Sequence, residues 1–167
     1  MPEPERKIHT ALKEVEEVML SKLSEGGSVT FSPKGTSMLP MLHSGTDSVT
    51  LIKPPDKPRK GTVALFILKD EKGGRRYALH RLVGIKNDEY VFCGDNRISC
   101  DPPVKYEDII AVVSEFTRNG KRHGVNGFFY CVYKTFMLAT VRIRPFTNRF
   151  ERSVYSLWKR IFRKKTK

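Results

Sequence analysis

The stretch TVALFILKDEKGGRRYALHRLVGI, residues 62–85, contains two apolar runs separated by a short polar segment with two glycines. Both runs are rich in Val, Leu, Ile, Phe and Tyr, residues that are enriched in strands. The polar segment 71–75, Glu-Lys-Gly-Gly-Arg, is typical of a hairpin turn. We therefore predict two antiparallel strands, at 62–68 and 76–85.

Similar short apolar runs lie on both sides of this hairpin, each bounded by Gly, Pro, Asp or Asn. They cover residues 28–32, 48–53, 90–93 and 109–116. The segment 53–60, Lys-Pro-Pro-Asp-Lys-Pro-Arg-Lys, is predicted to be a rigid connector, because proline fixes φ and lacks the donor that a ladder needs. No helix-length pattern interrupts this region, so we predict a mainly β, antiparallel domain.

Helical patterns flank this domain on both sides. Before it, apolar residues from Ile8 to Leu23 recur every three or four positions, which predicts an amphipathic helix over 5–23 that ends at Gly26-Gly27. After it, aromatic residues predict one helix around 128–137, and a second around 154–162 follows Pro145. We divide the chain into an N-terminal helix (1–27), a β domain (28–117) and a basic helical extension (118–167). The N-terminal helix either packs on the domain or binds a partner.

The positive charge of the chain is concentrated in the extension. The 167 residues carry a net charge of +13, yet residues 1–117 hold 17 basic and 17 acidic residues, whereas 118–167 hold 14 basic residues and one acidic. Such an asymmetry indicates an anionic partner. Tyr155, Trp158 and Phe162 among the basic residues favour a lipid interface, whereas the absence of a groove-reading motif disfavours nucleic acid. A helix packed on the domain, with a solvated basic face, is the alternative.

The expected compartment and the expected lack of a cofactor both rest on patterns that the sequence does not contain. Three cysteines form no disulfide framework by their number and spacing, and they do not complete a zinc site with the four histidines. The N-terminus lacks a secretory pattern, and no run of 18 apolar residues occurs. We therefore expect a cytoplasmic protein, peripheral to the inner face of the membrane through its extension, with no cofactor or metal. The oligomeric state is left open.

A serine motif and a histidine stand out as candidates for chemistry. Ser37 lies in Gly35-Thr-Ser-Met-Leu-Pro40, and a serine hydroxyl becomes a nucleophile only when a base takes its proton. Of the four histidines, His80 is distinctive because it lies inside an apolar strand, where an imidazole needs a reason to be. The alternatives are an ordinary turn serine and a core histidine with satisfied hydrogen bonds.

The segment 93–101, Cys-Gly-Asp-Asn-Arg-Ile-Ser-Cys-Asp, supplies two candidate carboxylates, Asp95 and Asp101. A carboxylate bonded to one ring nitrogen of a histidine fixes its tautomer and stabilises the cation that forms during catalysis. Gly-Asp-Asn is also good turn chemistry, so Asp95 is equally explained as a turn residue. The sequence leaves open which aspartate supports His80.

These motifs, in this order, resemble the signal peptidase superfamily of serine endopeptidases, which also contains the self-cleaving repressors of the SOS response. The matching segments are Gly35-Thr-Ser-Met-Leu-Pro40, Leu79-His-Arg-Leu-Val-Gly84, Gly94-Asp-Asn and Asp101. Many members pair the serine with a lysine. Because His80 takes that place here, the chain is most similar to the archaeal and endoplasmic-reticulum branch, which uses serine, histidine and aspartate. The resemblance covers about half the chain and implies a signal-peptidase-like β-barrel or complex β fold.

The resemblance also implies roles for individual residues. Ser37 would be the nucleophile and His80 the general base, with Asp101 orienting the ring. Asp95 would be the acid of the Gly-Asp motif, which shapes the site and shares in the role of Asp101. The backbone N–H of Ser37 and the hydroxyl of Thr36 would hold the oxyanion, where one donor is worth roughly a hundredfold in rate.

Three further residues of the serine motif have physical reasons to be there. Gly35 permits an unusual backbone conformation as the chain leaves the sheet. Met38 is a flexible apolar side chain suited to lining a cleft for a small substrate residue, and Pro40 stiffens the turn after the nucleophile. The chain departs from the family at 45–47, Gly-Thr-Asp, and 61–62, Gly-Thr, where the family has Gly-Asp, and it has a charged helix in place of a membrane anchor.

The predicted function is a serine-type endopeptidase that cleaves a peptide or precursor protein through an acyl-enzyme, as in signal peptide processing or pro-peptide removal. The alternative is a catalytically inactive, peptidase-like module that binds a peptide and docks to the membrane by its basic tail. A nucleic-acid-binding protein is the third and weakest candidate.

Overall fold

The computed structural model describes residues 16–70, 74–141 and 143–144. A helical segment over 16–24 precedes the sheet. The strands and helices that follow are β1 (Val29–Phe31), β2 (Ser48–Ile52), β3 (Val63–Lys69), β4 (Arg75–Lys86), β5 (Glu89–Cys93), the short 3-10 helix η1 (Tyr106–Asp108), β6 (Ile109–Arg118), β7 (Lys121–Gly124) and α2 (Phe128–Val141). The mainly β class and all six predicted strands are confirmed, and β7 is an additional strand.

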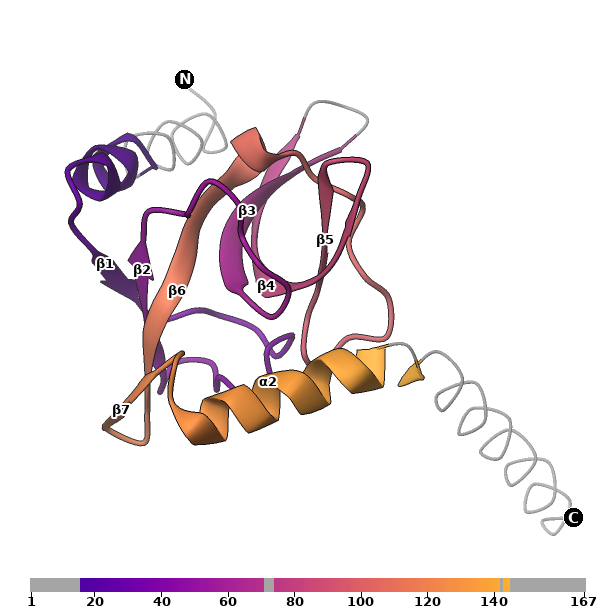
Figure 1. The fold of residues 1–167 in the computed structure, drawn as a ribbon. Helices are drawn as coiled ribbons and strands as arrows, with labels where there is room; N and C mark the ends of the chain where they lie inside the picture. The colour runs from indigo at the N-terminus through magenta and orange to yellow at the C-terminus, as the bar shows by residue number, and fades with distance from the viewer. Residues whose placement is uncertain (1–15, 71–73, 142, 145–167) are drawn as a thin grey trace, which may run out of the picture.

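All strand pairs in the sheet are antiparallel, and the strand order is β1-β2-β6-β3-β4-β5, with β7 pairing to β6. The sheet is curved but open (Figure 1), so the expectation of a closed barrel is wrong. Two features explain the open edge. β1 has only three residues, and the outer edge of β5 is occupied at Tyr90, which exchanges two backbone hydrogen bonds with Val104.

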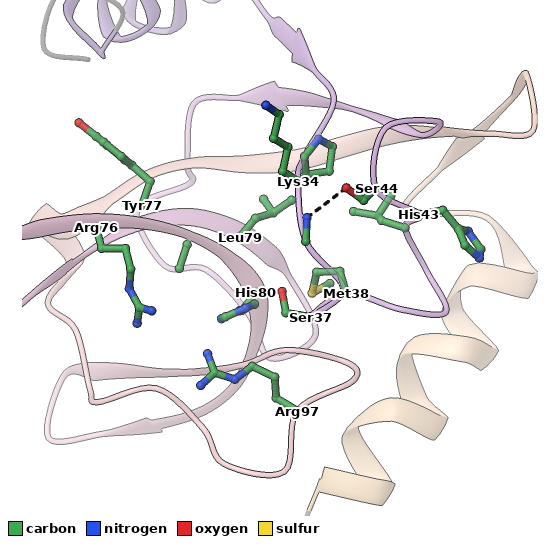
Figure 2. A pocket seen from close by; sticks show the side chains of 14 residues that line it. Lys34, Ser37, Met38, His43, Ser44, Arg76, Tyr77, Leu79, His80 and Arg97 are labelled. Carbon is green, nitrogen blue, oxygen red and sulfur yellow. Dashed lines mark hydrogen bonds between the residues drawn. The ribbon is translucent and has the colours of Figure 1, made fainter. Parts of the chain in front are cut away.

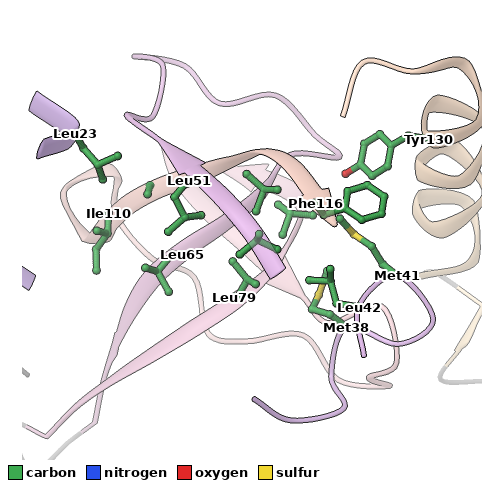
Figure 3. Packing of buried hydrophobic residues seen from close by; sticks show 14 of the residues in the cluster. Leu23, Met38, Met41, Leu42, Leu51, Leu65, Leu79, Ile110, Phe116 and Tyr130 are labelled. Atoms are coloured by element: carbon green, nitrogen blue, oxygen red, sulfur yellow. The ribbon is translucent and has the colours of Figure 1, made fainter. Parts of the chain in front are cut away.

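The central strand β3 is buried on both faces, which explains its uninterrupted apolar run. Its alternate residues Val63, Leu65 and Ile67 belong to one core cluster, and the residues between them, Ala64, Phe66 and Leu68, belong to a second. The first cluster extends along β6 from Leu23 of the N-terminal helical segment to Tyr130 of α2 (Figure 3).

The helical segment 16–24 and α2 lie at opposite ends of the sheet (Figure 1). Glu16 anchors the first by a salt bridge to Arg75 of β4 at 3.0 Å. At the other end, the buried ring of Tyr130 packs 5.8 Å from that of Phe116 on β6. The prediction of a helix around 128–137 is confirmed, and the N-terminal helix is confirmed over 16–23.

Several predicted features fall outside the described residues: the first part of the N-terminal helix (5–15), most of the hairpin turn (71–73) and the second helix of the extension (154–162). Within the ranges given above, no helix is both long enough and apolar enough to cross a bilayer.

Candidate active site

The turn that carries Ser37 connects β1 to β2 and is closed by its own backbone. Gly35 has a φ of +102°, a conformation that residues with a side chain rarely adopt. The unusual backbone conformation predicted for Gly35 from the sequence is therefore present. The amide of Leu39 donates to the Thr36 carbonyl at 3.2 Å, and that of Leu42 to the Met38 carbonyl at 3.0 Å. Met38 is buried, whereas Thr36 and Pro40 are exposed.

The Gly94-Asp-Asn motif is hydrogen-bonded to the backbone of this turn. The amide of Asn96 donates to the Ser37 carbonyl at 2.8 Å, and its side-chain amide donates to the Thr36 carbonyl at 3.2 Å. A Cβ at Gly94 would lie 2.6 Å from the Ser37 carbonyl oxygen, so only glycine permits this approach. Two motifs separated by more than 50 residues therefore form one unit.

His80 and Asp101 form a buried pair. Nδ1 of His80 lies 2.6 Å from Oδ2 of Asp101, and both side chains are almost inaccessible to solvent. Because a carboxylate only accepts, Nδ1 carries a proton, and in the neutral ring Nε2 is then the accepting nitrogen. Asp101 is itself held by its amide, which donates to the Phe92 carbonyl at 2.8 Å, and by Arg97, whose Nη1 donates to Oδ1 at 3.2 Å.

Ser37 and His80 line the same pocket, which has a volume of about 270 Å³. Figure 2 shows the Ser37 hydroxyl beside the edge of the His80 ring. No hydrogen bond joins the two side chains, and the Ser37 hydroxyl has no other partner among the described residues. Catalytic hydrogen bonds are often long in the absence of substrate, so this arrangement is compatible with proton transfer from Oγ to Nε2.

Two backbone amides of the serine turn have no hydrogen-bond acceptor among the described residues. In the part of the chain that the structure describes, the amides of Ser37 and Met38 donate to no acceptor, although the neighbouring amides of Gly35 and Leu39 both do. Free amides beside a nucleophile are the donors that stabilise an oxyanion. Met38 also lines the pocket, whereas Thr36 and Pro40 lie outside its lining.

Asp95 is directed away from His80 and pairs with Arg81. Nε and Nη2 of Arg81 donate to its two oxygens at 2.8 and 2.6 Å, and the Tyr133 hydroxyl donates to Oδ2 at 2.8 Å. Nη1 of Arg81 donates to the Gly61 carbonyl and to the Tyr130 hydroxyl, both at 2.9 Å. Of the two candidate aspartates, Asp101 contacts His80 and Asp95 joins β4 to α2.

The electrostatics of this second pair are those of a permanent ion pair. Burial disfavours the Arg81 cation, but its hydrogen bonds to Asp95 and the charge of that carboxylate outweigh burial and raise the pKa of Arg81 above its ordinary value. Burial and the negative charge of Asp95 raise the pKa of the Tyr133 hydroxyl, which therefore remains a donor.

Four functional or supporting residues are absent from the sequence-based prediction: Arg81, Arg97, Tyr133 and Arg144. Nη1 of Arg144 donates to the Gly94 carbonyl at 3.1 Å, so α2 and the residues after it support the same loop that supports Ser37. Only Arg81 had a signal in the sequence, because an arginine within an apolar strand needs a buried carboxylate. The others depend on tertiary contacts.

Other reactive groups near the site are engaged elsewhere. His43 lines the pocket, but its Nδ1 lies 3.3 Å from the buried Asp47. Burial and a hydrogen bond to Cys100 raise the pKa of Cys93 to about 12, so it is a neutral thiol and a poor nucleophile near pH 7. Among the described residues, no three His, Cys, Asp or Glu side chains gather as metal ligands would.

No protein-family model matches this chain, and no curated protein or solved structure is significantly similar to it.

Proposed function

We propose that this protein is a serine endopeptidase that cleaves peptides or precursor proteins at the Ser37–His80 pocket. Oγ of Ser37 attacks the substrate carbonyl carbon while Nε2 of His80 takes the hydroxyl proton. His80 then gives that proton to the leaving amine, and the C–N bond breaks to leave an ester on Ser37. Water hydrolyses the ester along the same path in reverse, with His80 again as the base.

The observation that carries the proposal is the buried His80–Asp101 pair, 2.6 Å apart, in a strand whose pocket also holds a serine hydroxyl. A core histidine with satisfied hydrogen bonds also needs a partner for its ring nitrogen, but it does not need a pocket with a serine hydroxyl at the edge of the ring. Asp101 acts as a positioning residue, because it fixes the tautomer that leaves Nε2 free to accept a proton.

The sheet also offers a place for an extended peptide. Residues 75–80 of β4 pair with β3 on one side, whereas β5 pairs only with residues 81–86. In the described part of the chain, the other edge of 75–80 is therefore unpaired, and it lies along the pocket. Backbone pairing at a free strand edge is a common way to bind a peptide, and it brings an internal peptide bond, rather than a chain end, to Ser37.

The test is to incubate the protein with a proteome-derived peptide mixture and to identify new termini by mass spectrometry. We expect cleavage by the wild type and by Ser32→Ala, a control serine that is exposed and outside the pocket lining. Ser37→Ala and His80→Ala should cleave nothing while retaining the wild-type circular dichroism spectrum. If no variant cleaves, but Ser37→Ala still binds peptides as the wild type does, the non-catalytic binding module is correct instead.

The second part of the proposal is attachment to an anionic membrane surface, supported by the outer face of α2. Phe128 and Phe129 are 75% and 87% exposed, and Val132 and Phe136 continue the stripe at helical spacing. Residues 118–144 contain basic residues but no acidic ones. An apolar helix face with basic neighbours suits the headgroup region of the inner leaflet, where each cation is worth ~1 kcal/mol.

Vesicle sedimentation tests this part separately. We expect binding to phosphatidylserine-containing vesicles, little binding to phosphatidylcholine alone, and a clear loss of binding in Phe128→Ser with Phe129→Ser. If this double variant binds the vesicles as well as the wild type does, α2 does not contact the membrane.

A further inference from the structure

The pocket that holds Ser37 and His80 has positively charged walls. Lys34, Arg76 and Arg97 line it, and none of the 14 described lining residues is acidic. Figure 2 shows the three cations on different sides of the serine and histidine. Basic and acidic residues are equally numerous in residues 1–117, so the excess at the pocket is a local feature.

Two of these cations are available to a ligand. Lys34 and Arg76 have no ion-pair partner among the described residues, whereas Arg75, next to Arg76, pairs with Glu16 at 3.0 Å. Arg97 contacts Asp101, but its side chain is 37% exposed. Cations that line a concave site raise the local concentration of an anionic ligand, because low-dielectric walls focus their field.

The position of Arg76 along β4 fixes which part of a substrate it meets. Arg76 and His80 are four residues apart and face the same side of the strand, which corresponds to about 13 Å at ~3.3 Å per residue. A peptide paired to the free edge of residues 75–80 advances by the same step. Its residue three or four positions from the scissile bond therefore lies beside Arg76, while Lys34 lines another side of the pocket (Figure 2).

We infer that the substrates of this site are acidic peptides, with Asp or Glu three or four residues from the scissile bond on the side that faces Arg76. The inference rests on the proposed peptidase function and adds its substrate class. Partly exposed ion pairs contribute little free energy, so replacing the acidic residue by its amide should lower kcat/KM about twofold to fivefold.

The experiment measures cleavage of a random decapeptide library by the full chain, with sites read by mass spectrometry. We expect the wild type to enrich Asp and Glu at the stated position, and Arg76→Glu to lose that preference or to favour Lys and Arg. Lys34→Glu provides a second variant with the same expected direction. Lys86→Glu is the matched control, because it changes the charge equally on an exposed residue of β4 outside the pocket.

A second readout does not require turnover. The Ser37→Ala variant should bind an acidic decapeptide, selected from the library by its binding to this variant, about twofold to fivefold more tightly than the Asn/Gln version of that peptide, with the difference shrinking at high salt. Cleavage without any acidic preference, or a preference that Lys86→Glu abolishes as fully as Arg76→Glu, overturns this inference and leaves the peptidase proposal standing. Absence of cleavage in every library, together with equal binding of both peptides, overturns both.

Discussion

His80 and Arg81 are neighbours on β4, yet they serve opposite sides of the sheet. Each holds an aspartate from the same loop: His80 pairs with Asp101 at 2.6 Å, and Arg81 pairs with Asp95 at 2.8 and 2.6 Å. Successive strand residues point to opposite faces. The first pair therefore opens onto the pocket, and the second is sealed beneath α2. Both pairs are buried, but of the four residues only His80 lines the pocket, so access to the pocket rather than burial distinguishes the two pairs.

The largest expected effect is on the pocket-facing pair. Asp101→Asn leaves a side chain of nearly the same shape but cannot hold the tautomer of His80 that carries the proton on Nδ1. We expect kcat/KM for a cleaved peptide to fall by about a thousandfold to ten-thousandfold, as in serine peptidases that lose this carboxylate. The unfolding midpoint in urea should change little by comparison. A fall of less than about tenfold would show that Asp101 has no positioning role.

The next effect is on stability and concerns the sealed pair. Arg81→Met leaves Asp95 as an uncompensated buried charge, so the free energy of unfolding should fall by about 3–5 kcal/mol. Urea denaturation measures it. Adding Asp95→Leu removes the orphan charge and should restore much of the loss. If Arg81→Met unfolds with the wild-type midpoint, the pair does not hold α2 to the sheet.

A smaller effect is expected where α2 meets this pair. Tyr133→Phe removes one donor to Asp95, which keeps both hydrogen bonds from Arg81, so we expect a loss of about 1–2 kcal/mol in the free energy of unfolding. Tyr106→Phe is the control, because its hydroxyl is 3.5 Å from the Pro54 carbonyl and lies at the limit of a hydrogen bond. If both variants lose the same free energy of unfolding, the hydrogen bond from Tyr133 to Asp95 makes no specific contribution to stability.

The smallest effect concerns Asp47, a third buried carboxylate. Burial raises its pKa, but hydrogen bonds from the His43 amide and ring and from Thr46 outweigh burial and lower it below the ordinary value. Because the folded-state pKa lies below the unfolded one, this stabilisation is complete above about pH 5 and is lost as the pH falls through the folded-state value. Asp47→Asn should therefore be less stable than the wild type at pH 7, by about 1 kcal/mol.

Urea unfolding at pH 7 and pH 3 measures this difference, which should narrow in acid. A difference that is constant or widens in acid would contradict the account of Asp47.

The sequence predicted the parts of this molecule that depend on local patterns. The runs that became β2 to β6 are apolar and bounded by turn residues, and the helix around 128–137 has a clear period. β7 was missed because Lys121–Gly124 contains no apolar side chain to mark a strand. The barrel was wrongly expected because closure depends on which distant segment reaches the free edge of β5, and Val104 occupies it.

The sequence predicted which residues belong to the candidate site, but not which of them contact one another. Ser37, His80, Asp95 and Asp101 stood out by residue type and context. Which aspartate meets His80 depends on the path of the loop after β5, where five residues separate Asp95 from Asp101. That Lys34 and Arg76 have no ion-pair partner among the described residues could not be predicted either, because their neighbours in the sequence, such as Arg75, are paired through distant segments.

The most direct test of the central claim, that His80 activates Ser37, is reaction with an electrophilic probe that acylates or phosphonylates activated serines, followed by peptide mapping. We expect a single adduct on the peptide that contains Ser37 in the wild type and in Lys86→Glu, and its loss in His80→Ala. Modification of Ser37 at the same rate in wild type and His80→Ala, or no modification of Ser37 at all, would contradict it.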